Sequence, residues 1–320
     1  MPKASDIAVI HAGAVGDMVQ ALPTLRAIRV KWPEARVTLI GRPERGRLAQ
    51  MAGLVDACVH MDSSGLWRLM GGGRLAGPGA PGFGRADLVI DFLGCLAGSV
   101  LEGRRRPFQI VSARAIPPAD WKESAAAWIF GQVAPRLELP PVSLEPALVV
   151  PAAILEAARG TLAANRIAGP FAVIHPGSGS PKKNWPMDRF SRIAQRLRKD
   201  WGRRVVWLLG PAEQERGVAP PVAEGQAVVA DLALDEVAPV LALADVYVGN
   251  DSGITQVAAA VRTNDGEPTA TVALFGPSDP RVWAPRGPHV RVIRSPDGTM
   301  AAIETEQVWH KLTDLLSISE

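Results

Sequence analysis

Short apolar runs of strand length alternate with longer segments of helical period from one end of this chain to the other. Such alternation is typical of parallel sheets whose strands are connected by helices. A first series predicts strands at Ile7–His11, Val37–Gly41, Ala57–His60 and Leu88–Asp91, and its clearest helix at Met18–Trp32. We therefore expect an α/β fold that begins with one doubly wound sheet.

A second series of the same kind predicts a second doubly wound sheet. Its strands are expected at Phe171–His175, Val205–Gly210, Ala227–Ala230, Val246–Val248 and Ala270–Phe275, and its helices near Met187–Trp201, Asp235–Ala244 and Ser252–Val261. The length of 320 residues also favours two domains, because one domain takes about 150 residues.

A proline-rich stretch between the two series predicts the interdomain linker. Residues 135–151 contain Pro135, Pro140, Pro141, Pro146 and Pro151, a density at which neither helix nor strand is expected to continue. The predicted domains are thus residues 1–150 and 151–320. The last helical pattern, Ile303–Leu316, has no strand after it, which leaves room for it to return across the domain boundary.

Composition indicates a globular protein, with 47% hydrophobic and 21% charged residues. The chain has no apolar run of about 18 residues, and its first ten residues lack a signal-peptide pattern, so we expect a cytoplasmic location. Cys58 and Cys95 stand in apolar surroundings, which favours buried thiols in a reducing compartment over a disulfide or a zinc site. We expect no metal site.

The net charge of +3 says little about partners, but arginines cluster locally. The clusters are Arg42, Arg45 and Arg47, and Arg104, Arg105 and Arg106. Either they form a solvated surface or they attract an anionic partner. Nucleic acid is not expected, because only Phe108 supplies an aromatic side chain near the second cluster. The glycine- and proline-rich segment Gly71–Gly84 predicts a long loop, either a lid over an acceptor or a tolerated insertion.

The turn after the first predicted strand carries the first candidate site. In HAGAVGDMVQ, Gly13 and Gly16 permit a tight turn and Asp17 falls at the start of the next helix. The spacing is not that of a dinucleotide-binding turn, and a carboxylate there would repel a pyrophosphate. Asp17 is a candidate N-cap that the helix dipole keeps ionised, and a candidate base for an alcohol proton. His11 is either an ordinary polar residue or a supporting one.

The loop after Phe171–His175 predicts a phosphate cradle in the second domain. It reads PGSGSPKKNWP, in which Ser178, Gly179 and Ser180 offer hydroxyl and backbone donors and Lys183 offers a positive charge. The spacing is not that of a P-loop. The alternative is that Lys183 is an ordinary solvated lysine.

Two further turns are expected at the same sheet edge. The segment GNDSG places Asp251 or Ser252 as the cap of a helix whose first N–H groups form an anion site. After the next strand, Gly276, Pro277 and Ser278 follow at the edge where doubly wound sheets bind ligands.

Together these segments resemble glycosyltransferase family nine, the ADP-heptose:lipopolysaccharide heptosyltransferases and their relatives. The resemblance rests on GAVGDMVQALPTLRAI, HPGSGSPKKNWP, and GNDSGITQVAAA followed by ALFGPSDP, in that order. It implies a GT-B fold of two Rossmann-like domains facing a cleft. The acceptor is expected on the first domain and the nucleotide sugar on the second, with inversion at the anomeric carbon and no bound metal or other cofactor.

By this resemblance Asp17 matches the catalytic base, Lys183 the lysine that faces the donor phosphates, and Asp251 and Gly253 the motif that holds the ADP-sugar. The other expected donor-binding residues are Ser178, Gly179, Ser252 and Gln256, and those expected at the acceptor side of the cleft are His11, Gly13 and Gly16. The expected partners are a nucleotide sugar and a lipid-linked saccharide such as the lipopolysaccharide core, with peripheral contact at the inner face of the cytoplasmic membrane.

Two departures from the family pattern keep alternatives open. Gln256 stands where many members carry histidine, and Arg262–Pro268 is longer than the usual turn. A glutamine donates a hydrogen bond but carries no charge. The alternatives are a GT-B transferase that uses another nucleotide sugar, and a non-catalytic relative that binds a nucleotide or a glycan.

Overall fold

The protein is described from a computed structural model that covers residues 4–63, 86–94, 96 and 109–317. The predictions made for Gly71–Gly84, Cys95, Arg104–Arg106 and Phe108 lie outside these residues. The chain divides into two compact units, Met1–Pro146 and Ala147–Glu320, and each is described by itself.

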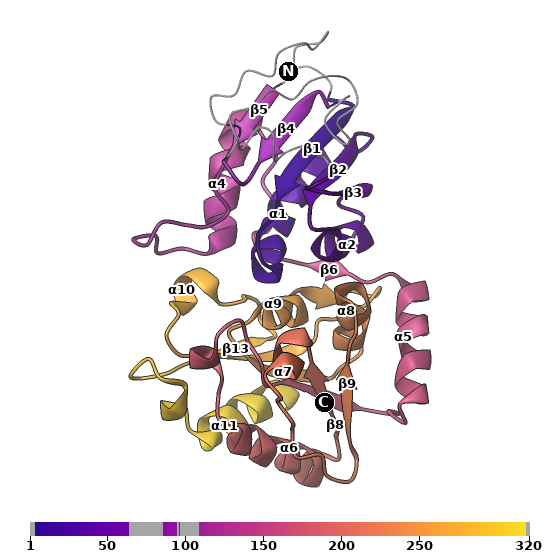
Figure 1. Ribbon diagram of the computed structural model, residues 1–320, viewed down its shortest axis with the longest axis vertical. Helices are drawn as coiled ribbons and strands as arrows, with labels where there is room; N and C mark the ends of the chain where they lie inside the picture. Colours follow the sequence, from indigo (N-terminus) through magenta and orange to yellow (C-terminus); the bar gives the residue numbers. More distant parts are fainter. Residues whose placement is uncertain (1–3, 64–85, 95, 97–108, 318–320) are drawn as a thin grey trace. The chain divides into compact units, whose positions relative to one another are not determined.

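The first unit contains a five-stranded parallel sheet (Figure 1). Its strands are β1 (Asp6–His11), β2 (Arg36–Gly41), β3 (Ala57–His60), β4 (Leu88–Asp91) and β5 (Gln109–Ser112), and its described helices are α1 (Val15–Lys31), α2 (Pro43–Met51) and α4 (Ala125–Leu137). The strand order is β3-β2-β1-β4-β5 and every pairing is parallel. This is the order of a Rossmann-like sheet, in which the chain reverses direction beside its first strand.

The expected start of the linker is wrong, because Pro135 lies inside helix α4. A proline removes one backbone hydrogen bond and crowds the carbonyl four residues earlier, which here belongs to Gly131. The helix nevertheless continues to Leu137, since its buried face includes Ile129, Val133 and Leu137. Tertiary burial thus outweighs the local preference of the proline.

The second unit repeats the architecture with six parallel strands. They are β7 (Phe171–His175), β8 (Arg204–Leu209), β9 (Gln226–Ala230), β10 (Val246–Asn250), β12 (Ala270–Phe275) and β13 (Val290–Arg294). The order β13-β12-β10-β7-β8-β9 is again Rossmann-like when the six strands are counted along the chain. A separate two-stranded sheet pairs β6 (Leu148–Val149) with β11 (Val261–Arg262).

In the second unit the helices expected near 187–201, 235–244, 252–261 and 303–316 are present, whereas those at 152–164, 211–215 and 280–283 were not expected. The helices of this unit are α5 (Ala152–Ala164), α6 (Met187–Trp201), α7 (Pro211–Glu215), α8 (Leu234–Ala242), α9 (Gly253–Ala260), α10 (Pro280–Trp283) and α11 (Thr305–Leu316), with short 3-10 turns at Pro181–Lys183 and Met300–Ala302. Helix α6 shows the pattern on which the expected helices rest: Phe190, Ile193 and Leu197 recur at helical spacing and are buried. Gly202, at φ 62°, then ends the helix.

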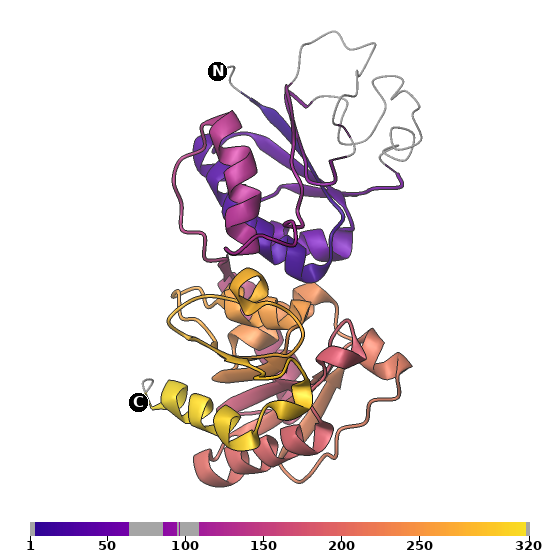
Figure 2. The same ribbon diagram turned by 90° about the vertical axis from the view of Figure 1, so that its left-hand side faces the viewer.

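Helix α11 packs within the second unit. It contacts α6, β12 and β13, and Figures 1 and 2 both show it beside α6. Leu312, Leu315 and Leu316 join the buried core formed by strands β7, β8, β10 and β12. None of the described helices combines the length and the apolar composition needed to cross a bilayer.

Candidate functional site

In both sheets the strand order reverses beside the first strand, between β1 and β4 and between β7 and β10. Ligands of doubly wound proteins bind in the crevice at the carboxyl ends of the strands at such a point. The residues singled out in the sequence follow these strands directly. Asp17 comes after β1, Lys183 after β7, and Asp251 after β10.

Asp17 is the third residue of α1 and not its N-cap, which is Ala14. Its Oδ2 accepts a hydrogen bond from the backbone N–H of Ala14 at 2.8 Å. The carboxylate therefore reaches back to the turn, as the acidic member of a capping box does. Gly16 is the second residue of the same helix.

Gly13 leaves room for this carboxylate. A Cβ atom at position 13 would lie 2.8 Å from Asp17 Oδ2 and 3.0 Å from His11 Cε1. Both distances are shorter than an ordinary van der Waals contact, so a side chain here would displace one neighbour or the other. The glycine predicted for the turn is thus required by packing against Asp17 and His11.

Burial raises the pKa of the Asp17 carboxyl, and the Ala14 N–H and the charge of Arg45 oppose this shift. Burial is the largest of these influences, so the pKa of Asp17 lies above its usual value despite the favourable hydrogen bond and charge. A raised pKa makes Asp17 a stronger proton acceptor than an exposed aspartate.

A pocket of about 880 Å³ opens beside Asp17 in the first unit. Its wall includes His11 and Gly13 from the β1–α1 turn, Phe92 after β4, and Ile116 and Trp128 from the segment after β5 and from α4. The volume is in the range of ligand pockets, and the lining is mostly apolar, as in such pockets generally.

His11 is only 2% exposed, and its ring nitrogens have no hydrogen-bond partner among the described residues. The ring packs edge-on against Phe92, with centroids 5.9 Å apart. Burial lowers the pKa of His11 to about 4, so the imidazole is neutral at physiological pH.

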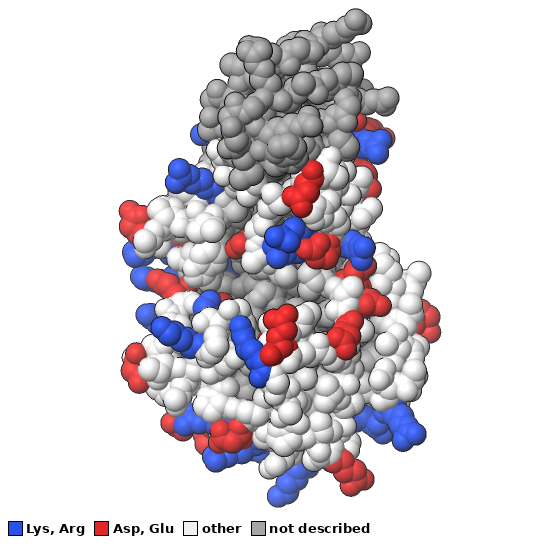
Figure 3. Space-filling model, in the orientation of Figure 1, with Lys and Arg blue, Asp and Glu red and all other residues white. Residues whose placement is uncertain are grey.

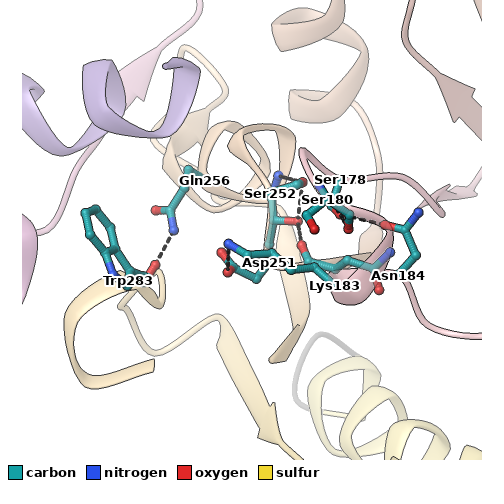
Figure 4. Close-up of polar contacts among 10 residues, drawn as sticks. Ser178, Ser180, Lys183, Asn184, Asp251, Ser252, Gln256 and Trp283 are labelled. Carbon is teal, nitrogen blue, oxygen red and sulfur yellow. Dashed lines mark hydrogen bonds and ion pairs between the residues drawn. The ribbon is translucent and has the colours of Figure 1, made fainter. Parts of the chain in front are cut away.

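In the second unit, Lys183 Nζ donates a hydrogen bond to Asp251 Oδ2 at 2.6 Å and forms an ion pair with it (Figure 4). The Asp251 side chain is 10% exposed and that of Lys183 is 33% exposed. Lys183 is therefore held in place from the loop after β7 by a carboxylate that follows β10. The alternative that it is an ordinary solvated lysine is wrong.

The loop that carries Lys183 is held by its own polar groups. Buried Ser178 donates to the carbonyl of Ser180 at 2.7 Å and lies 2.6 Å from Asn184 Oδ1. Gly179 is exposed, and a Cβ placed on it would meet nothing within 4 Å.

The segment after β10 caps the next helix. Ser252 is the N-cap of α9, and its Oγ accepts the N–H of Thr255 at 3.2 Å. Gly253 is the first residue of the helix. Gln256 points away from Lys183 in Figure 4, because its amide nitrogen donates to the carbonyl of Trp283. The glutamine thus connects α9 to α10.

These turns are supported by three residues that were not among the predicted site residues. Arg45 donates to the carbonyls of Ala12 and Gly13, although the sequence suggested only a surface cluster. Asn250, fully buried, accepts from Trp185 N at 3.0 Å and donates to the carbonyl of Pro176 at 2.8 Å. Glu213 is 3% exposed and accepts from the N–H of Gly210 at 2.9 Å. Arg45 stood in the arginine cluster and Asn250 in the GNDSG segment, whereas Glu213 carried no signal in the sequence.

Gly177 packs so closely on Glu213 that a Cβ at position 177 would overlap the buried carboxylate. Gly177→Ala is therefore expected to lower the free energy of unfolding by about 1–3 kcal/mol. Gly179→Ala, two residues further along the same loop, is the matched control and should change it little. Thermal unfolding of both variants checks this, and equal midpoints would show that the loop is not constrained at position 177.

The long turn Arg262–Pro268 closes on itself. Arg262 and Pro268 form an isolated antiparallel bridge, and the N–H of Thr263 donates to the carbonyl of Glu267 at 2.9 Å. Gly266, at φ 90°, supplies the left-handed residue of the turn.

Charges are mixed on the surface. On the face shown in Figure 3, basic and acidic side chains of the described residues are interspersed, and no large area of one sign is visible among them.

Comparison with known proteins places the chain in a family. The model of glycosyltransferase family 9 (heptosyltransferase) matches residues 128–312. Among curated proteins, lipopolysaccharide heptosyltransferase 1 of Escherichia coli strain K12 is 32% identical over 152 residues, which cover 46% of this chain and 45% of that protein. The matches to such curated relatives span between 30% and 45% of the length of those proteins.

Solved structures show the fold over the whole chain. A glycosyl transferase family 9 protein from Veillonella parvula DSM 2008 superposes with a TM-score of 0.75 at 19% identity, covering 98% of this chain and 97% of that one. The E. coli ADP-heptose lps heptosyltransferase II gives a TM-score of 0.71 at 21% identity, covering 98% and 99%. The predicted GT-B fold of two Rossmann-like domains is confirmed. Since the family model matches more than half of the sequence, the chain belongs to glycosyltransferase family 9.

Proposed function

We propose that this protein is an inverting glycosyltransferase that moves a sugar from a nucleotide diphosphate to a hydroxyl of a saccharide acceptor. The observation that carries the proposal is Asp17, a carboxylate with a raised pKa on the wall of a pocket of about 880 Å³. A transferase needs such a base where the acceptor hydroxyl binds.

In the proposed reaction the acceptor oxygen attacks the anomeric carbon from the face opposite the diphosphate. A new carbon–oxygen bond forms as the bond to the phosphate oxygen breaks, and the nucleoside diphosphate leaves with that electron pair. The hydroxyl proton passes to the Asp17 carboxylate. Because a carboxylate is a weak base, it takes the proton late, as the new bond forms.

The departing diphosphate needs positive charge, and Lys183 is the proposed source. Its ammonium is already held by Asp251 at 2.6 Å, so little side-chain freedom is lost when a phosphate binds beside it. The N-terminus of α9, with Ser252 as its cap, adds backbone donors and the positive end of a helix dipole. With these groups the proposal assigns no metal or other cofactor to the reaction.

The proposed donor is an ADP-sugar, and specifically ADP-heptose. Its support is family membership and the likeness to a protein described as an ADP-heptose lps heptosyltransferase. The proposed acceptor is a lipid-linked saccharide such as the lipopolysaccharide core, reached at the cytoplasmic face of the membrane. The match to lipopolysaccharide heptosyltransferase 1 supports it.

Nucleotide selectivity tests the donor assignment. A ligand present at about 100 times its Kd stabilises the folded state by about 2.7 kcal/mol, which is several degrees in the unfolding midpoint of a domain of this size. We expect ADP to raise the midpoint more than UDP or GDP at equal concentration. A larger shift with UDP would favour a transferase that uses another nucleotide sugar.

A non-catalytic relative is the second candidate, because Gln256 binds the Trp283 carbonyl and carries no charge. Such a protein would respond to ADP in the thermal assay but would not modify an acceptor. The retained Asp17 and Lys183 favour the transferase.

A further inference from the structure

Arg45 binds the backbone of the β1–α1 turn through its guanidinium. It lies on α2, and its Nη1 donates to the carbonyl of Ala12 at 3.3 Å and to that of Gly13. The same Gly13 packs against Asp17, because a Cβ added to the glycine would lie 2.8 Å from Asp17 Oδ2. Gly13 therefore accepts a hydrogen bond from the guanidinium of Arg45 and packs against the carboxylate of Asp17.

The charge of Arg45 is directed at this turn. No described carboxylate forms an ion pair with it, in contrast to Arg29, which pairs with Asp56 at 2.8 Å. Its contacts in the described part of the chain are backbone carbonyls, which are dipoles and do not cancel a unit charge. A half-buried guanidinium beside a half-buried carboxylate interacts more strongly than the same pair in water.

We propose that Arg45 is a positioning residue for the transfer reaction: it fixes the turn that presents Asp17 and supplies the positive charge beside that carboxylate. The inference rests on the proposed function. Arg45 is not part of the pocket wall, so it acts on the base and not on the acceptor.

Other charged or titratable groups near Asp17 are few among the described residues. His11 from β1 lies on the same wall, and Arg114 on the segment after β5 lines the pocket, whereas α4 contributes the neutral Trp128 and Gln132. The charge of Arg45 opposes the burial-driven rise in the pKa of Asp17 and adds to the fall in that of His11. Removing this charge should raise the proton affinity of both groups.

Two substitutions separate the charge of Arg45 from its hydrogen bonds. Arg45→Gln keeps an N–H donor for the turn but loses the charge, and Arg45→Lys keeps the charge. The matched control is Arg42→Gln, an exposed arginine three residues earlier. The first readout is the pH titration of the Asp17 carboxyl carbon, followed by NMR. The signal is assigned by its absence in Asp17→Asn, and the measurement needs neither the sugar donor nor the acceptor saccharide.

We expect the Asp17 pKa to rise by about 0.5 to 1 pH unit in Arg45→Gln, and to stay at the wild-type value in Arg45→Lys and Arg42→Gln. In the pH profile of the transfer rate, the pH at which activity is lost on the acid side should rise by the same amount in Arg45→Gln. An unchanged pKa in Arg45→Gln, or an equal rise in Arg45→Lys, overturns the inference. If Arg45→Gln raises the Asp17 pKa but the wild-type protein transfers no sugar, the effect of Arg45 on Asp17 stands and the proposed function is overturned.

Discussion

Asp17→Asn is expected to slow sugar transfer by about 10²- to 10⁴-fold, the range over which a positioned base contributes, and to leave ADP binding nearly unchanged. Asparagine has the shape of aspartate, and its amide oxygen can still accept the Ala14 N–H that Asp17 accepts at 2.8 Å. What it loses is the ability to take a proton. Transfer rate and ADP affinity, measured on the same preparation, check the result.

Stability provides the folding control for this variant. Burial raises the pKa of Asp17 in the folded state. At a pH between the pKa values of the unfolded and the folded state, the native protein therefore binds more protons than the unfolded chain. Stability then falls as pH rises through that window, and the penalty is complete above it. Asparagine carries no such penalty. At neutral pH the variant should therefore unfold at the wild-type temperature or above, and a comparable loss of transfer and of ADP binding would contradict the assigned role.

Lys183→Met is expected to weaken ADP binding by about 10- to 100-fold, because a hydrogen bond to a charged group is worth about 1.5–3 kcal/mol. The neighbouring Lys182→Met is the matched control: Lys182 is exposed and has no assigned role. Isothermal titration with ADP measures both. Equal affinities in the two variants would remove Lys183 from the donor site.

The substitution also leaves Asp251 without its partner, and its side chain is only 10% exposed. An unpaired buried carboxylate destabilises the fold, which would complicate the comparison. The double variant Lys183→Met with Asp251→Asn restores neutrality at the pair. If its stability returns while ADP affinity stays low, the loss of affinity is not caused by unfolding.

The buried strands were the most predictable part of the fold. Strands such as β7 and β12 are buried along their whole length and form continuous apolar runs, which is the pattern of a parallel sheet covered on both faces. Strand β5, with an exposed Gln109 and only Val111 buried, and β13, with charged Arg291 and Arg294, lack that pattern. Both escaped prediction because strands with so little continuous apolar sequence look like loops.

The candidate site was predictable where its residues lie in glycine-bearing turns. Lys183 and Asp251 follow β7 and β10, which are neighbours in the second sheet, so chain order alone brings these two residues to one sheet edge, and Asp17 follows β1 in the first sheet. Arg45 and Glu213 were missed because their roles depend on which backbone group each helix brings near. An arginine on α2 and a glutamate on α7 are indistinguishable in sequence from solvated surface charges.

The mass of the acceptor after reaction tests the central claim most directly, because ADP release alone could also come from hydrolysis of the donor. The protein would be incubated with ADP-heptose and truncated core lipid, and the lipid analysed by mass spectrometry beside a quantitative ADP assay. We predict one added heptosyl residue for each ADP released with the wild-type protein, and far less of both with Asp17→Asn. An unmodified lipid, with or without ADP release, would contradict the account.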